Sequence, residues 1–234
     1  MYERKYITME MDKIKEENFE IMRYKDFDWK NASVEDWLQF CKANKEFIEP
    51  GISYDELRAL HEATEFFGHK PMRVVETGQC FGTTTRYFIV RNIKYGGDLY
   101  SYEVKVRDLF KEYMEKLDLW KYITLRKNSV KDEYDGKRID FLFIDSEHAL
   151  QDALGEYMRF RPFIYESTII GFHDCDICPG VGKALQFINE VDLLKLISRS
   201  TDKLGAGVMF FKRIKAGRTD RPWQKQKGRE LYEF

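Results

Sequence analysis

The chain has 234 residues, of which 43% are hydrophobic and 34% charged, and its formal net charge is −1. This composition predicts a globular protein with one substantial core, and the charge argues against nucleic acid as a partner because phosphate contacts require a basic surface. No apolar run approaches the roughly 20 residues that span a bilayer, and the first residues lack the apolar segment of a signal peptide, so no membrane partner is expected.

Residues 1–52 are expected to form a helical arm. Ser33 and Ser53 each begin the Ser-x-x-acid pattern of a capping box, ahead of apolar residues at helical spacing. The second helix carries His61, which we interpret as a half-buried structural histidine. The many aromatic side chains of the arm predict a lid over the acceptor side of a binding cleft or, alternatively, the interface of a homo-oligomer.

From Arg73 onward, short apolar strands alternate with helices, which is typical of βαβ units in a mainly parallel sheet. Strands are expected at 73–77, 98–103, 122–126, 139–145 and 167–173, with helices at about 84–94, 105–117, 149–161 and 182–190. Two further strand candidates, at 193–198 and 205–212, end the domain. The predicted fold class is α/β, a doubly wound sheet over residues 53–214, followed by a basic tail at 215–234.

The most informative segment is the turn after the first strand, where Glu76 is followed by Gly78 and Gly82. Glycines at such a turn let the backbone bend sharply or let a ligand approach it. Gln79-Cys80 breaks the Gly-x-Gly-x-x-Gly dinucleotide fingerprint, and Thr83 stands where a P-loop would have lysine. The acid at the strand end suits a cationic or hydroxyl-rich ligand instead of a phosphate.

Acids also follow the other strands, and ligands of open α/β sheets bind beyond these carboxyl ends. Glu103 lies 27 residues after Glu76, where an acid can accept two hydrogen bonds from a ribose. Asp145 and Asp174 end two strands that we expect to be neighbours, about 4.8 Å apart, so they should face one cleft. A divalent cation between them would offset their repulsion; alternatively, one acid caps the following helix and the other is solvated.

These motifs resemble those of a known family. Glu-x-Gly-x-x-x-Gly after a strand resembles motif I of the class I S-adenosylmethionine-dependent methyltransferases. Phe-Ile-Asp-Ser-Glu-His, followed by Ile-Ile-Gly-Phe-His-Asp and Pro-Gly-Val-Gly-Lys-Ala, resembles the cephalosporin-hydroxylase-like and macrocin sugar O-methyltransferase branch, over roughly residues 52–212. The resemblance implies a seven-stranded Rossmann-like sheet closed by an antiparallel hairpin. It also implies methyl transfer from S-adenosylmethionine to a hydroxyl of a small polar acceptor, sugar-like or phenolic.

The resemblance assigns roles to individual residues. It places S-adenosylmethionine against Glu76, Gly78, Gln79, Gly82, Thr83, Glu103, Ser129 and Asp145. It makes Asp145, His173 and Asp174 the ligands of a divalent metal such as Mg²⁺, with His173 standing where relatives have an acid. The catalytic residues it implies are Asp145 and His148, of which the histidine, three residues after the acid, is the candidate base. Ser146 departs mildly from the family pattern, which often has glycine there.

The four cysteines are scattered and form no disulfide framework, which predicts a reducing, cytoplasmic setting. Cys175-x-x-Cys178 could form half a zinc site with His173, but a structural zinc usually needs a second cysteine pair, which the sequence lacks. The alternative is two incidental free thiols.

Two other function classes share part of the pattern. An NAD(P)-dependent oxidoreductase would have the same sheet and ribose acid but a different glycine fingerprint. A non-catalytic nucleoside-binding module derived from a methyltransferase would keep the cofactor residues and could lose His148 and Asp174. The tail at 215–234, with six Lys/Arg against three acids, could contact RNA or an anionic substrate, although a solvated terminus is the simpler interpretation.

Overall fold

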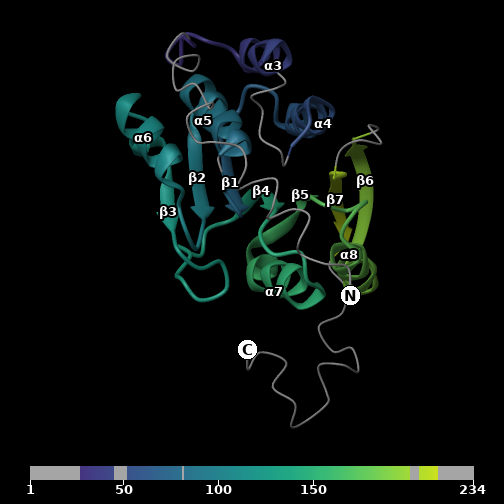
Figure 1. Ribbon diagram of the computed structural model, residues 1–234. Helices are drawn as coiled ribbons and strands as arrows, with labels where there is room; N and C mark the ends of the chain where they lie inside the picture. Colours follow the sequence, from purple (N-terminus) through teal and green to yellow (C-terminus); the bar gives the residue numbers. More distant parts are fainter. Residues whose placement is uncertain (1–26, 45–51, 81, 201–205, 216–234) are drawn as a thin grey trace.

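The computed structural model describes residues 27–44, 52–80, 82–200 and 206–215, so the predicted basic tail after Lys215 lies outside the described residues. These residues form one seven-stranded sheet of order β3-β2-β1-β4-β5-β7-β6, in which β7 runs antiparallel to both its neighbours (Figure 1). The strands are β1 Met72–Thr77, β2 Gly97–Tyr102, β3 Thr124–Arg126, β4 Ile139–Ile144, β5 Ile164–Phe172, β6 Leu193–Arg199 and β7 Met209–Lys215. The doubly wound fold and its closing hairpin are therefore confirmed.

Most helices of the described residues begin within one residue of the predicted position. They are α3 Val34–Ala43, α4 Tyr54–Thr64, α5 Thr83–Tyr95, α6 Asp108–Lys116, α7 Leu150–Phe160 and α8 Pro179–Val191, with short 3₁₀ turns at 65–67, 120–122 and 161–163. Both capping boxes form, at Ser33 and Ser53. The last helix begins three residues earlier than expected, at Pro179, because proline suits the first helical position, where its missing N–H has no partner to lose.

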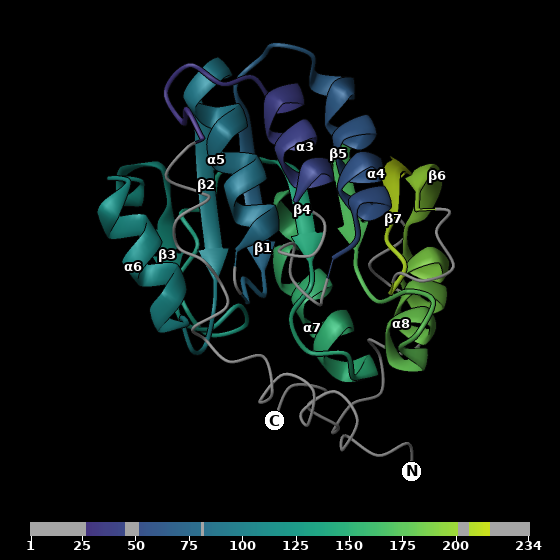
Figure 2. The same cartoon turned by 45° about the horizontal axis from the view of Figure 1, so that its top comes forward.

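Side chains of the central strands alternate between two buried layers, as the pleat of a strand requires. One layer contains Val74, Phe141, Phe143 and Phe210 with side chains from α3, α4, α5 and α6. The other contains Val75, Leu142, Ile144, Ile170 and Phe172 with side chains from α7 and α8. Figures 1 and 2 show α7 and α8 side by side, and α3 beside both α4 and α5. Helices therefore cover both faces of the sheet.

The described part of the N-terminal arm belongs to the core. Trp37 in α3 and Leu57 in α4 have no exposed surface, and both belong to the same buried cluster as Phe88 and Phe141. Trp37 is buried within this chain, whereas Phe40 and Tyr54 are only partly buried and pack against the same cluster, so the lid or subunit interface expected of the arm stays a prediction. The remaining residues of that prediction, 1–26 and 45–51, lie outside the described residues.

The register of the central strands brings their carboxyl ends to one edge. Thr77, Ile144 and Phe172 are paired across β1, β4 and β5. The residues that follow them, Gly78, Asp145 and His173, must therefore lie next to one another. None of the helices in the described residues has the length and apolar composition needed to cross a membrane.

Candidate active site

The turn after β1 depends on its two glycines. Gly78 has φ +76°, and a Cβ there would lie 1.8 Å from the carbonyl oxygen of Asp145. Gly82 has φ +83°, and a Cβ there would lie 2.2 Å from the ring of Phe110. Any side chain at either position would strain the backbone and collide with its neighbour. Gly78 thus lets the turn lie against Asp145 at the end of β4, and Gly82 lets it lie against Phe110 of α6.

Glu76, at the end of β1, anchors the start of α5, which follows this turn. Its carboxylate has no exposed surface and accepts hydrogen bonds from the hydroxyls of Thr84 (2.6 Å), Thr85 (2.7 Å) and Ser101 (2.9 Å). Burial raises the pKa of Glu76 to about 7, although the three hydroxyl donors favour the ionised form. The hydroxyl partners were not predicted, but the threonine run after Gly82 was a signal for them.

Glu103 faces the glycine turn from the end of β2. One of its carboxylate oxygens accepts the backbone N–H groups of Gln79 (2.9 Å) and Cys80 (3.0 Å), and the other accepts that of Lys105 (3.0 Å). Two buried side-chain oxygens near the turn, Gln79 Oε1 and Thr83 Oγ1, have no hydrogen-bond partner among the described residues. Unpaired buried polar atoms are costly, so these two are available to a polar ligand at the turn.

Ser129, in the segment after β3, donates a hydrogen bond from its hydroxyl to Glu156 of α7. Glu156 is buried and also accepts the hydroxyls of Ser146 and Thr77, each at 2.7 Å. Burial raises the pKa of this carboxyl. Sequence reasoning missed Glu156, although an acid on the apolar face of α7, between Ala153 and Phe160, was the signal for it.

The three predicted metal ligands come together. His173 Nδ1 lies 3.1 Å from Asp145 Oδ1 and 3.1 Å from Asp174 Oδ2. One donor atom from each of the three residues lies within 4.8 Å of the others. Asp174 has φ +58°, an uncommon conformation for a residue with a side chain, which is held at the point where β5 turns toward α8.

The charges of this cluster are strongly coupled. Burial alone would lower the pKa of His173, but Asp145, Asp174 and Glu56 outweigh it and hold that pKa well above the usual value. Burial raises the pKa of Asp145. Against burial, hydrogen bonds from His148 and His173 hold the pKa of Asp174 well below its usual range. A cation at this position, either the imidazolium of His173 or a metal, is what the two acids require.

His148 lies at the outer side of the cluster, at the start of α7. Its Nε2 is 2.7 Å from Asp174 Oδ2, and about half of its side chain (48%) is exposed. The hydrogen bond to Asp174 raises the pKa of His148, against the effect of burial. The predicted base is therefore oriented by one of the predicted metal ligands while its ring remains accessible.

Glu56 lies behind His173. Its carboxylate is fully buried, accepts the backbone N–H groups of Ser53 (2.6 Å) and Gly207 (2.7 Å), and has Oε2 3.6 Å from His173 Nε2. Against burial, His173 keeps the pKa of Glu56 below its ordinary value. The sequence identified Glu56 only as part of a capping box, because nothing local links it to β5.

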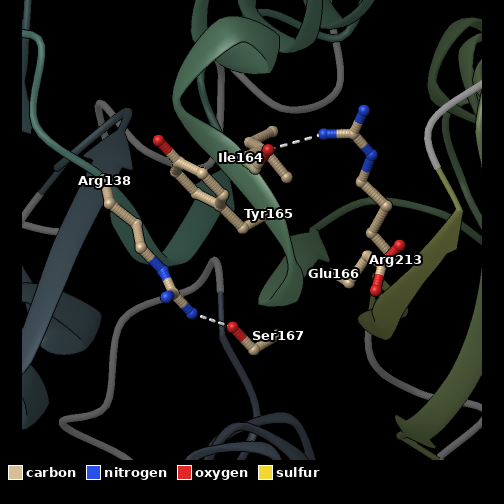
Figure 3. A pocket seen from close by; sticks show the side chains of 6 residues that line it. All are labelled: Arg138, Ile164, Tyr165, Glu166, Ser167 and Arg213. Atoms are coloured by element: carbon tan, nitrogen blue, oxygen red, sulfur yellow. Dashed lines mark hydrogen bonds between the residues drawn. The ribbon is translucent and has the colours of Figure 1, made fainter.

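A separate hollow of about 520 Å³ lies at the opposite edge of the sheet, where β4 and β5 begin (Figure 3). Arg138 donates to the hydroxyl of Ser167 and lies over the ring of Tyr165 at 5.0 Å. Arg213 donates to the carbonyl oxygen of Ile164 (2.6 Å) and pairs with Asp192. Both arginines that line the hollow therefore have partners within the protein, and none of the predicted site residues lines it.

Comparison with known proteins agrees with this geometry. Residues 75–175 match the model of a family described as a methyltransferase domain, a segment that runs from β1 to the turn after β5. No curated protein sequence matches the chain. The family match and the sheet order agree: residues 75–175 resemble a methyltransferase domain, and the fold is that of the class I S-adenosylmethionine-dependent methyltransferases. The resemblance predicted from the sequence is confirmed, and the oxidoreductase alternative is not supported.

Solved structures share the fold at low sequence identity. A TDP-rhamnose 3′-O-methyltransferase of calicheamicin biosynthesis aligns with a TM-score of 0.55 and 12% identity, covering 76% of this chain and 90% of that one. An O-methyltransferase from Bacillus cereus in complex with S-adenosylhomocysteine gives 0.54 and 16%, covering 76% and 90%. An O-methyltransferase of tomaymycin synthesis from Streptomyces achromogenes, in complex with S-adenosylmethionine, gives 0.54 and 13%, covering 77% and 88%.

Proposed function

We propose that the protein transfers a methyl group from S-adenosylmethionine to a hydroxyl oxygen of a small polar acceptor, sugar-like or phenolic. The observation that carries this proposal is the pair formed by His148 and Asp174, 2.7 Å apart at the edge of the sheet where the glycine turn lies. The names of the three structural neighbours, all O-methyltransferases, support it. The net charge of −1 favours a small acceptor over nucleic acid, and four free cysteines favour a reducing cytoplasm.

The residues around the turn fit the methyl donor. Gly78 lets the turn approach the backbone of Asp145, and Gly82 lets it approach the ring of Phe110, which gives the compact turn that the donor would contact. Glu103 would accept hydrogen bonds from the ribose hydroxyls. These bonds would replace some of those that its carboxylate accepts from the backbone N–H groups of the turn. Gln79 Oε1 and Thr83 Oγ1, both buried and unpartnered within the described residues, would bind polar atoms of the methionine part. Glu76, Ser129 and Asp145 complete the predicted set, the first two acting through the hydroxyl networks that they join.

His148 would act as the general base. If its Nε2–H donates to Asp174, the neutral ring has its lone pair at Nδ1, which can take the acceptor's proton. The acceptor oxygen then bonds to the methyl carbon, and the carbon–sulfur bond breaks with its electron pair remaining on sulfur. The products are the methyl ether and S-adenosylhomocysteine. The chain's main contribution is to hold oxygen, carbon and sulfur in line while Asp174 fixes the ring.

A divalent metal such as Mg²⁺ is a second element of the proposal. Asp145, His173 and Asp174 offer oxygen and nitrogen donors within 4.8 Å of one another. Glu56, behind the far ring nitrogen of His173, matches the carboxylate that usually supports a metal-bound histidine. When bound, such an ion would make the acceptor hydroxyl more acidic. Without it, a protonated His173 would offset the repulsion between the two acids.

The test is methyl transfer with an isotopically labelled donor, against a panel of small hydroxyl compounds. Wild-type protein is expected to label at least one of them. The His148→Ala variant should lose about 10²–10⁴-fold in turnover, as removal of a general base typically does, while S-adenosylhomocysteine affinity stays within twofold or so. An unchanged turnover in this variant would remove His148 from the reaction. Full turnover in excess EDTA, with Asp174→Asn equally active, would remove the metal.

A further inference from the structure

A second group of donor atoms shares Asp174 with the proposed Mg²⁺ ligands. His148, Asp174 and Cys178 each offer one ligand atom, and these atoms lie within 4.8 Å of one another. The group differs from the first in chemistry, because it combines an imidazole nitrogen, a carboxylate oxygen and a thiol sulfur. It also differs in access, because His148 is exposed and Cys178 is only partly buried, whereas Asp174 is buried.

The turn from Asp174 to Cys178 is built to hold its two donors together. The backbone N–H of Cys178 donates to the carbonyl oxygen of Asp174 at 3.0 Å, which closes the turn. The loop between β6 and β7 fixes the turn from the other side, since Cys175 donates to the carbonyl of Gly207 (3.0 Å) and Asp176 to that of Ala206 (3.1 Å). The separation of carboxylate and thiol is therefore set by backbone hydrogen bonds and not by flexible side chains alone.

A glycine brings the third donor to the same place. A Cβ at Gly180 would lie 2.3 Å from the carbonyl oxygen of His148 and 2.8 Å from the backbone nitrogen of Leu150. Only glycine lets the first turn of α8 pack this closely against the backbone where α7 begins. Because Cys178 immediately precedes α8 and His148 precedes α7, this contact places the imidazole beside the thiol.

We propose that His148, Asp174 and Cys178 form a binding site for a thiophilic divalent cation such as Zn²⁺. Zinc accepts nitrogen, oxygen and sulfur donors at once, and many zinc sites have three protein ligands with water in the fourth position. A thiolate donor favours such an ion over Mg²⁺, which prefers oxygen. The site is distinct from the Asp145–His173–Asp174 group in its donors, and the two groups have only the carboxylate of Asp174 in common.

Occupation of this site would inhibit methyl transfer, a consequence that rests on the proposed role of His148. The ion would take His148 Nε2 and one oxygen of Asp174, so the hydrogen bond between them would be lost. A neutral imidazole bound through Nε2 carries its proton on Nδ1 and can no longer accept one from the acceptor hydroxyl. Zinc would therefore act as an inhibitor, whereas Mg²⁺ would not engage the thiol.

Binding is tested first, with a readout that does not depend on activity. Co²⁺, a spectroscopic substitute for Zn²⁺, is titrated into the tag-free, full-length protein after chelator treatment. We expect one thiolate-to-cobalt charge-transfer band per chain in the wild-type protein, lost in Cys178→Ser and retained in Cys175→Ser. Cys175 is the matched control because its thiol donates to the carbonyl oxygen of Phe172 instead. Zinc affinity in Cys178→Ser should fall by more than the roughly 10–100-fold typical of losing an outer-shell partner. Circular dichroism and S-adenosylhomocysteine affinity check that both variants fold.

Absence of a thiolate band in the wild-type protein, or a band that Cys178→Ser retains, would overturn the site. In the second arm, micromolar Zn²⁺ should inhibit wild-type turnover, while Cys178→Ser has the same basal turnover and resists inhibition. Equal sensitivity of the two proteins would overturn the inhibitory role. If no acceptor is methylated at all, the proposed function fails, and the cobalt titration still decides the metal site on its own.

Discussion

Glu56 Oε2 lies 3.6 Å from Nε2 of His173, so one carboxylate both caps the N-terminus of α4 and supports the central histidine of the site. The same carboxylate accepts the N–H of Gly207 in the loop between β6 and β7. Three parts of the chain that are distant in sequence meet at this side chain. The geometry of the acid–histidine cluster is thereby coupled to the helix that precedes the sheet.

The Glu56→Gln variant separates these roles. The carboxylate accepts Ser53 through Oε2 and Gly207 through Oε1, whereas glutamine has one acceptor oxygen and keeps only one of these bonds, so it should lose less stability than Glu56→Ala. Loss of the negative charge should lower the pKa of His173, which can be measured by NMR titration of the metal-free protein. Glu56→Ala is the matched comparison: it leaves the buried N–H of Gly207 unpaired and should cost about 1–3 kcal/mol of stability. A His173 pKa that is unchanged in Glu56→Gln would show that the two residues are not coupled.

Glu76 should make stability depend on pH in a defined direction. Its pKa of about 7 in the folded protein exceeds the ordinary value of 4.5, so the folded state binds the proton more tightly than the unfolded state. The stabilisation from this proton is complete below pH 4.5 and is lost as pH rises through 7, with a full size of about 3 kcal/mol. Denaturant unfolding across this range should therefore show a flatter profile for Glu76→Gln than for wild type. Parallel profiles would refute the raised pKa.

Gly78 and Gly155 lie in different environments, so alanine at each position gives a matched pair of substitutions. Gly78→Ala places a Cβ 1.8 Å from a backbone oxygen at φ +76°, so we expect loss of stability above about 1–3 kcal/mol together with loss of cofactor binding. Gly155→Ala, in α7 with nothing within 4 Å, should stabilise the protein by about 0.4–1 kcal/mol. Thermal unfolding of both variants measures the contrast. A tolerated alanine at residue 78 would mean that the turn does not lie against β4.

The arm is tested by Trp37→Ala. Because the indole is fully buried against the sheet's helical layer, truncation should cost about 3–5 kcal/mol in the free energy of unfolding. Phe66→Ala removes a ring that is 59% exposed and should change stability by less than about 0.5 kcal/mol. If Trp37→Ala were as mild as Phe66→Ala, α3 would be a peripheral element.

Much of the site could be predicted because it follows from local sequence and one rule of topology. The glycine turn is encoded next to β1, and parallel strands place Asp145 and Asp174 at one edge. Glu56 and Glu156 could not be assigned in the same way, because their partners come from other elements of the fold. The lid function of α3 stays a prediction for a related reason: an aromatic face has the same sequence pattern whether it covers a cleft or packs into the core.

A calorimetric titration of S-adenosylhomocysteine and of NAD⁺ into the same preparation tests the central claim most directly. We expect one S-adenosylhomocysteine site per chain and no NAD⁺ binding. Loss of charge-assisted ribose contacts is worth about 1.5–3 kcal/mol, so Glu103→Ala should weaken S-adenosylhomocysteine binding about tenfold or more. Binding of NAD⁺ without S-adenosylhomocysteine, or an affinity that does not change in Glu103→Ala, would contradict the assignment of this turn to the methyl donor.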